Sequence, residues 1–225
     1  MKLRAFLLRY FAPLVRPHGK EAFLKSLRPG DQLLDVGCGN NSPLRAKQCA
    51  PGIHYTGLDI GDYNQRLDSI QSADSYLITT PSEFTSTIEN LAETFDALVS
   101  SHNLEHCEQP ERVLRAMCAA LKHSGRMYLS FPSEASVRLP RRRKNTLNFF
   151  DDPTHTQPPK LSQVLSAIQE GGLRIELMIT RHRPFLPMLG GLALEPVSYL
   201  MQRAMPFGTT WALYGFETVI WAVRR

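Results

Sequence analysis

The sequence predicts an α/β fold class: a doubly wound, mainly parallel seven-stranded sheet with helices on both faces. The first observation is an apolar run over 31–37 that carries Asp35 and ends at Gly37 and Gly39. A buried parallel strand that meets a ligand at a tight turn has this pattern. The second observation is that short apolar runs alternate with amphipathic helical segments. Such alternation gives parallel strands, because each crossover returns the chain to the same edge of the sheet.

The individual elements follow from local patterns in the sequence. Apolar runs bounded by turn residues predict strands over 31–37, 54–60, 75–79, 95–102, 126–131, 174–180 and 216–223. Helical periodicity and capping residues predict helices over 20–28, 42–50, 82–91, 110–121 and 161–170. The polar segment 61–74 reads as a loop.

The chain ends differ in character from this alternating centre. Residues 2–16 alternate basic and apolar side chains at near-helical spacing, so we expect 1–29 to form an N-terminal helical cap on the domain 30–225. A helix lying on a membrane surface is the alternative for this segment, because arginines flank its apolar positions.

Two long segments interrupt the predicted domain. Residues 132–159 hold five prolines and read as a loop, which we assign to acceptor binding. Residues 184–208 are an apolar insertion rich in Pro, Gly and Met. This insertion is expected to cover the acceptor pocket as a lid with hinges at Pro184, Pro187, Gly190 and Gly191; a partner subunit and the membrane surface are the alternatives.

Composition limits the class of protein. The chain has 225 residues, 43% of them hydrophobic, which suffices for a core, and a net charge of +5. This modest excess favours anionic partners, but no nucleic-acid-binding signature accompanies it, so we expect no nucleic acid.

The cysteines and the chain start bear on location. The four cysteines form no C-x-x-C pair, which argues against zinc and for free thiols in a reducing cytoplasm. The apolar start is broken by arginines and Pro13, unlike a signal peptide. We therefore predict a cytoplasmic protein, with peripheral contact at the inner membrane surface as an open alternative.

Three motifs together resemble one enzyme family. They are LDVGCGNN over 34–41, GLDI over 57–60 and FDALVSSHNLEH over 95–106, and Asp59 follows Gly39 by twenty residues. An acid at this offset and strand end is placed to bind a ribose diol. Over residues 30–180 the chain resembles the class I S-adenosylmethionine-dependent methyltransferases, of the type found among bacterial surface-polysaccharide and lipopolysaccharide genes. A doubly wound domain that binds another nucleotide is the alternative.

The resemblance implies a Rossmann-like methyltransferase fold with an antiparallel last strand, and S-adenosylmethionine as cofactor with S-adenosylhomocysteine as product. It places Asp35 near the cofactor's amino group, and Asp59 on its ribose hydroxyls. Many relatives carry an acid after the third strand for adenine; here Thr79 and Thr80 take its place. The cofactor-binding residues implied by this comparison are Asp35, Gly37, Cys38, Gly39, Asp59, Ile60, Thr80 and Ser101.

Histidines near the predicted crevice are the candidate catalytic residues. His102 and His106 follow the fourth strand, and His155 lies in the segment Asp-Asp-Pro-Thr-His. Any of the three can act as a general base, since imidazole titrates near neutrality. Glu105 is the fourth candidate; it and His106 either take part in catalysis or brace the loop. Asp152 is an acidic alternative base, and no metal is expected.

The function predicted is methyl transfer to a small-molecule or glycan/glycolipid-precursor acceptor. An anionic acceptor would suit the basic run 141–144, which otherwise is a solvated face. Two alternatives stay open: a methyltransferase acting on a quinone, lipid or other metabolite, and a non-catalytic cofactor-binding scaffold.

Overall fold

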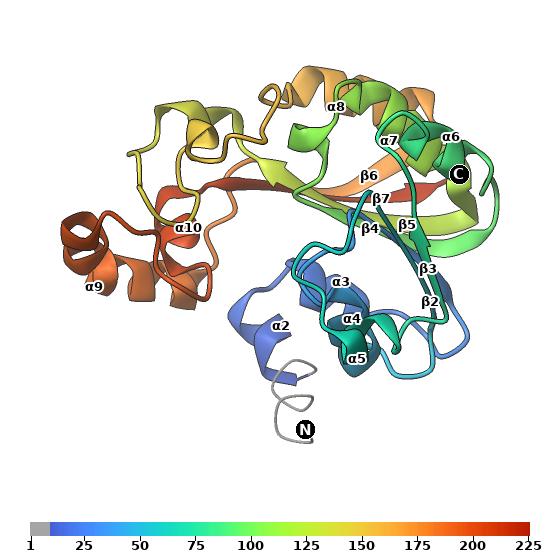
Figure 1. The fold of residues 1–225 in the computed structure, drawn as a ribbon, viewed down its shortest axis with the longest axis horizontal. Coiled ribbons are helices and arrows are strands. Elements are labelled where there is room, and N and C mark those ends of the chain that lie inside the picture. The colour runs from blue at the N-terminus through green and yellow to red at the C-terminus, as the bar shows by residue number, and fades with distance from the viewer. Residues whose placement is uncertain (1–9) are drawn as a thin grey trace.

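The structure, a computed structural model, describes residues 10–225. Its centre is one seven-stranded sheet in the order β3-β2-β1-β4-β5-β7-β6, flanked by helices (Figure 1). The strands are β1 (Gln32–Val36), β2 (His54–Asp59), β3 (Ser75–Ile78), β4 (Phe95–Ser101), β5 (Leu121–Pro132), β6 (Leu173–Ile179) and β7 (Glu217–Arg224). All seven predicted strands are confirmed.

The register of the first four strands aligns their carboxyl ends. Strand β1 pairs in parallel with both β2 and β4, and Val36 is level with Leu58 and Ser100. The residues that follow these positions therefore emerge at one edge of the sheet. This edge is where an open α/β sheet binds its ligands.

The end of the sheet reverses direction, as predicted. Strand β7 pairs antiparallel with β5 on one side and with β6 on the other, so it alone opposes the other strands. Glu217 is level with Pro132 at the carboxyl end of β5. The start of β7 therefore reaches the same edge as the ends of β1 and β4.

Helices cover both faces of the sheet (Figure 1). Alternate residues of β1 point to opposite sides: Leu34 and Val36 join a core with one group of helices, and Leu33 joins the other core. The first group is α6 (Phe84–Glu89), α7 (Pro110–Ala120) and α8 (Leu161–Glu170); the second is α3 (Lys20–Lys25) and α4 (Ser42–Cys49). Apolar side chains fill both cores. The packed helices therefore hold the sheet rigid, including the edge where the parallel strands end.

The structure corrects several predicted boundaries. The loop over 61–74 contains a short helix, α5 (Leu67–Ile70), and a helix α10 (Thr209–Tyr214) was not predicted. Strand β5 begins at Leu121 rather than at residue 126, with a register shift against β4. Of the predicted helix 2–16, only α2 (Ala12–Val15) lies within the described residues; residues 1–9 lie outside them.

The segment 184–208 also differs from expectation. It forms a helix, α9 (Phe185–Met201), so the predicted hinge at Gly190 is wrong. Glycine persists inside this helix because α10 packs closely on it: a Cβ on Gly191 would overlap the Thr209 carbonyl. No helix between residues 10 and 225 is both long and apolar enough to cross a bilayer.

Candidate active site

Two neighbouring cavities open at the carboxyl edge of the sheet. The smaller, about 290 Å³, is lined by Gly37, Gly39 and Ser101, and also by His102, Lys20, Arg16, Arg45, Tyr128, Trp211 and Glu217. The larger, about 630 Å³, is lined by Asp59 and Ile60 together with Pro81, Ser82, Phe84, Asn103, His106 and Gln109. Together these two spaces suit an elongated ligand with a polar end and a flat end.

Glycines form the boundary between the cavities. Gly37 has a φ of +75°, and a Cβ there would lie 2.8 Å from the Asn103 side chain. A Cβ on Gly39 would lie 3.2 Å from the Tyr63 carbonyl oxygen and 3.8 Å from Asp59 Oδ2. Gly37 is thus required by its backbone conformation and by crowding, whereas Gly39 keeps open the passage from the smaller cavity to Asp59.

Asp59 lies at the end of β2 on the wall of the larger cavity. Its Oδ1 accepts a hydrogen bond from the Ile60 N–H at 2.8 Å. Burial raises the pKa of Asp59, while hydrogen bonds from the backbone N–H groups of Ile60 and Gly39 oppose this. The carboxylate is fixed by the backbone and remains on the cavity wall, where it can accept hydrogen bonds from ligand hydroxyls.

Asp35, which the resemblance places near the cofactor's amino group, lies behind residues of the smaller cavity. It is fully buried and accepts hydrogen bonds from Lys20 Nζ at 3.0 Å, Ser42 Oγ at 2.5 Å and Tyr55 OH at 2.8 Å. Asp35 lines neither cavity, whereas Lys20 and Ser42 line the smaller one. A ligand there therefore meets Lys20 and Ser42 first, and Asp35 orients both of them.

Some of the other predicted cofactor residues line a cavity, and others do not. Ile60 lines the larger cavity and Ser101 the smaller, and Ser101 Oγ lies 2.9 Å from Ser130 Oγ. The Cys38 side chain is buried in the core on the α3 and α4 face. Thr80 lines neither cavity, because its hydroxyl donates to Glu83 Oε2 at 2.7 Å; Pro81 and Ser82 reach the larger cavity instead.

His102 lies between two carboxylates just after β4. Its Nδ1 is 3.0 Å from Glu105 Oε1, and its Nε2 is 3.2 Å from Glu217 Oε2. Burial favours the neutral ring, but hydrogen bonds to both carboxylates and their charges raise the pKa of His102 to about 9. The ring is therefore protonated at neutral pH with both nitrogens occupied, which makes His102 a fixed cation rather than a base.

Glu217 is the functional residue that sequence reasoning missed. It is buried, and besides His102 it binds Arg16 Nη2 at 2.5 Å and His182 Nδ1 at 3.1 Å. Burial opposes its ionisation, yet the Arg16 charge and the hydrogen bonds from the two histidines lower the pKa of Glu217. The sequence did offer one indication, because Glu217 is an acid at the start of an otherwise apolar last strand. Its partners, however, come from distant segments of the chain.

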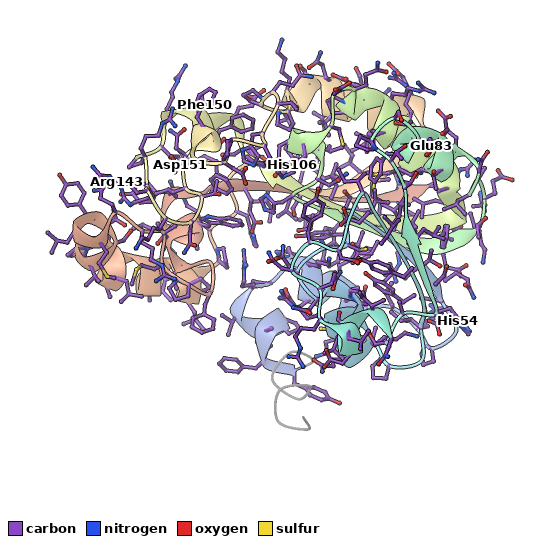
Figure 2. The ribbon with its side chains drawn as sticks, viewed as in Figure 1. His54, Glu83, His106, Arg143, Phe150 and Asp151 are labelled. Atoms are coloured by element: carbon purple, nitrogen blue, oxygen red, sulfur yellow. The ribbon has the colours of Figure 1, made fainter. Side chains whose placement is uncertain are left out.

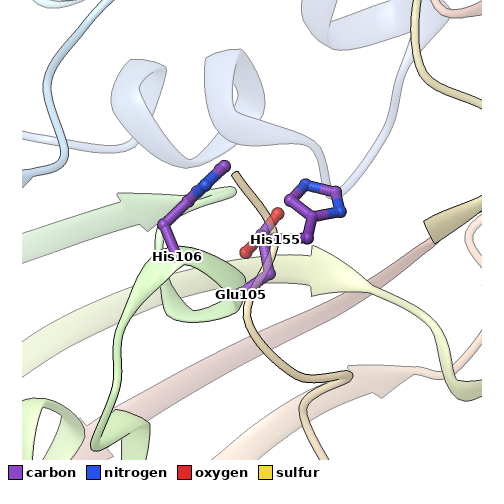
Figure 3. A group of neighbouring side chains, drawn as sticks. All are labelled: Glu105, His106 and His155. Atoms are coloured by element: carbon purple, nitrogen blue, oxygen red, sulfur yellow. The ribbon is translucent and has the colours of Figure 1, made fainter. Parts of the chain in front are cut away.

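Glu105, His106 and His155 lie close together (Figure 3). Within the described residues, each offers one ligand-type atom, and these atoms lie within 4.8 Å of one another. The two imidazole rings meet edge to face, with centroids 4.9 Å apart. The acceptor-loop histidine predicted from the sequence is thus brought beside the Leu-Glu-His motif.

Hydrogen bonds define the tautomers of these two histidines. His155 Nδ1 lies 2.6 Å from the Phe149 carbonyl oxygen, which only accepts, so Nδ1 carries the proton. His106 Nδ1 lies 3.0 Å from Thr154 Oγ1, whose own proton goes to Asp152 Oδ1 at 2.6 Å. Both rings therefore keep the lone pair on Nε2 for a proton or a metal ion. The absence of a metal stays a prediction from the sequence.

The proposed alternative base, Asp152, is less suited to that task. Burial raises its pKa, but hydrogen bonds from the Thr154 hydroxyl and N–H outweigh this, and the net shift is downward. A carboxylate with a lowered pKa is a weak base at neutral pH. Asp152 instead orients His106 through Thr154.

Comparison with known protein sequences identifies a family and several relatives for this chain. A family model described as a methyltransferase domain matches residues 6–177. Among curated relatives, the ubiquinone biosynthesis O-methyltransferase of Marinobacter nauticus is 31% identical over 106 residues, which cover 45% of this chain and 44% of that protein. The enzyme of the same name from Proteus mirabilis is 27% identical over 184 residues, 76% of this chain and 73% of that protein. In the first of these matches the aligned part spans less than half the relative's length.

Solved structures show the same fold at low identity. A SAM-dependent methyltransferase from Archaeoglobus fulgidus has a TM-score of 0.55 at 18% identity, covering 99% of this chain and 94% of that one. A putative S-adenosylmethionine-dependent methyltransferase from Listeria monocytogenes has a TM-score of 0.57 at 16% identity, with full coverage of both chains. The [4+2]-cyclase SpnF, at 0.55 and 16%, covers 91% of this chain and 79% of that one. A shared fold therefore does not by itself fix the reaction.

Proposed function

Because this chain belongs to the methyltransferase domain family, we propose that it transfers the methyl group of S-adenosylmethionine to a hydroxyl oxygen of a small acceptor. The observation that carries this proposal is the pair of cavities at the carboxyl edge of the sheet: Gly37, Gly39 and His102 line the smaller one, and Asp59 and His106 line the larger one. The bound cofactor supplies a methyl group already activated on a sulfonium. The protein has to position the acceptor and assist loss of its proton.

The residues around the cavities fit this cofactor. Asp59 and the apolar and hydroxyl side chains of the larger cavity suit an adenosine, with the carboxylate accepting from both ribose hydroxyls. Lys20, Arg16 and Arg45 give the smaller cavity a cationic wall for the carboxylate of the methionine part.

The acid–base roles follow from the protonation states. The Nε2 lone pairs of His106 and His155 make these two residues the candidate bases for the acceptor hydroxyl. His106 also lines the larger cavity, whereas His102 lines the smaller one as a cation. His102 then orients Glu105 and stabilises negative charge that develops on the acceptor oxygen.

An aromatic hydroxyl of the quinone-precursor class is the acceptor we favour. Two curated relatives are named ubiquinone biosynthesis O-methyltransferases. Trp211 lines the smaller cavity and packs against His102 and Phe216, with ring centroids 4.8 Å and 4.6 Å away. The acceptor would share this cavity with the methionine part of the cofactor, and the aromatic wall beside it suits a flat ring better than a sugar.

A paired acceptor assay tests the proposal. The protein is given S-adenosylmethionine with a prenylated catechol or with a nucleotide sugar, and S-adenosylhomocysteine is measured with each. We expect release with the catechol and little with the sugar. Release with the sugar alone would replace the acceptor class by the glycan precursor, and cofactor binding without release in either case would indicate a non-catalytic protein.

A further inference from the structure

Helix α9 is oriented opposite to an ordinary surface helix. The residues that face the protein body are small or polar: Pro187, Gly191 and Ser198 are buried. Ser198 Oγ donates to the Arg203 carbonyl at 2.8 Å and lies 3.3 Å from Arg142 Nε. The large apolar residues face away, and they are Phe185, Leu186, Leu189, Leu192, Val197, Tyr199, Leu200 and Met201. Surface helices of water-soluble domains show the reverse pattern.

This apolar face does not cover the active site. None of the residues of α9 lines either cavity at the sheet edge. In the ribbon, α9 lies at one end of the molecule, beyond α10 and away from the central sheet (Figure 1). The lid expected from the sequence is therefore not what these side chains form, and so large an exposed apolar surface indicates a binding face.

The charges around the face are positive. Arg181 and Arg183 precede the helix and are exposed. At its other end, the N–H groups of Arg143 and Lys144 both donate to the Gln202 carbonyl, which brings these exposed residues close to α9 (Figure 2). The nearby acids are already paired: Glu195 binds Arg142 at 2.5 Å, and Asp151 lies 3.8 Å from Arg141. The face is thus apolar along its length and cationic at both ends.

We propose that the exposed face of α9 binds the surface of an anionic phospholipid bilayer, with its leucines and aromatics in the acyl boundary and the arginines on the phosphates. Apolar side chains bordered by cations are the signature of a helix that lies in the membrane interface. A second copy of the chain fits less well, because a two-fold contact along α9 would bring cationic ends together in either orientation. Helix α2 contacts α9, and Leu14 within α2 and Phe11 just before it are also exposed.

Vesicle co-sedimentation of the full chain tests this assignment. Binding should be stronger to phosphatidylcholine vesicles that contain phosphatidylglycerol than to phosphatidylcholine alone, and salt should weaken it. Leu192→Glu combined with Leu200→Glu should lower the partition coefficient by about tenfold or more, since each leucine loses its burial in lipid. Arg143→Gln combined with Lys144→Gln should reduce only the additional vesicle binding that phosphatidylglycerol confers.

A control substitution at an equally exposed leucine outside α9 shows whether the effect is specific to that helix. Leu67 is exposed to 70%, close to the 64% of Leu192, but lies on α5. Leu67→Glu should bind vesicles like the unmodified chain, and circular dichroism and S-adenosylhomocysteine binding should show all variants folded. Vesicle binding that survives the α9 substitutions would overturn the proposal. A dimer by light scattering that dissociates with Leu192→Glu, together with no vesicle binding, would assign the face to a second copy instead.

Discussion

The Nε2 atom of His102 lies 3.2 Å from Glu217 Oε2, although the two residues are 115 positions apart in the sequence. The contact ties the loop after β4 to the start of β7. Because Glu217 also binds Arg16 and His182, one buried carboxylate holds the N-terminal segment, the histidine loop and the last strand together. The geometry of the active site therefore depends on a residue outside every recognisable motif.

This contact makes stability depend on pH. The folded-state pKa of His102 is about 9, above the ordinary value of 6.5. A raised histidine pKa contributes stability in full below 6.5, and this contribution is lost as pH rises through 9. We expect the free energy of unfolding to fall by roughly 3 kcal/mol over this window in urea melts, and His102→Gln to flatten the decline.

His123 supplies the control for this measurement. It is exposed on β5, so His123→Gln should leave the pH profile of the native chain unchanged. A decline of equal size in His102→Gln would show that other groups cause it.

Asp59→Asn tests the ribose contact. The substitution keeps the size of the side chain but replaces an ionised acceptor, so affinity for S-adenosylhomocysteine should fall about 10- to 100-fold by calorimetry. The exposed neighbour Asp62, changed to Asn, should bind normally. Equal affinities in both variants would remove Asp59 from the cofactor site.

His106 and His155, the two candidate bases, should matter for turnover rather than for cofactor binding. We expect His106→Ala or His155→Ala to lower kcat by roughly 100-fold while the Kd for S-adenosylhomocysteine changes little. His54 begins β2 and lies at the lower right of Figure 2, away from His106 near its centre, so His54→Ala should retain full activity. Unchanged kcat in both active-site variants would leave positioning alone as the role of this loop.

Gly37→Ala separates backbone strain from crowding. Alanine at φ +75° costs about 1–2 kcal/mol, and its Cβ would also displace Asn103 from between the cavities. Gly30 has a φ of +91°, and a Cβ added there would meet no atom within 4 Å, so Gly30→Ala carries the strain alone. Thermal melts should show a larger loss for Gly37→Ala, and only that variant should also lose cofactor affinity.

The sequence alone predicted those features that depend on local residue patterns. The strand pattern, the Gly-x-Gly turn and Asp59 were readable because burial and close backbone approach impose residue types at fixed spacing. It also predicted that His155 lies near the motif after β4, and the structure places it beside Glu105 and His106, although it lines neither cavity. For Asp35, the strand pattern could not show that the side chain accepts hydrogen bonds from Lys20, Ser42 and Tyr55 and lines neither cavity.

Other parts depend on tertiary contacts and could not be read. Glu217 acquires its role only when Arg16, His102 and His182 converge on it. For 184–208, composition suggested a loop with hinges, because Pro and Gly usually end helices. The segment is instead largely helical. Helix α10 packs against Gly191, and the leucines of α9 are exposed.

The central claim is transfer of a methyl group to oxygen, and an isotope experiment tests it most directly. The protein is incubated with S-adenosylmethionine that carries a trideuterated methyl group and with a prenylated catechol, and both products are followed by mass spectrometry. We predict a trideuteromethyl ether and an equal amount of S-adenosylhomocysteine, both strongly reduced in Asp59→Asn. A label on a carbon of the acceptor, or bound cofactor that is never consumed, would contradict it.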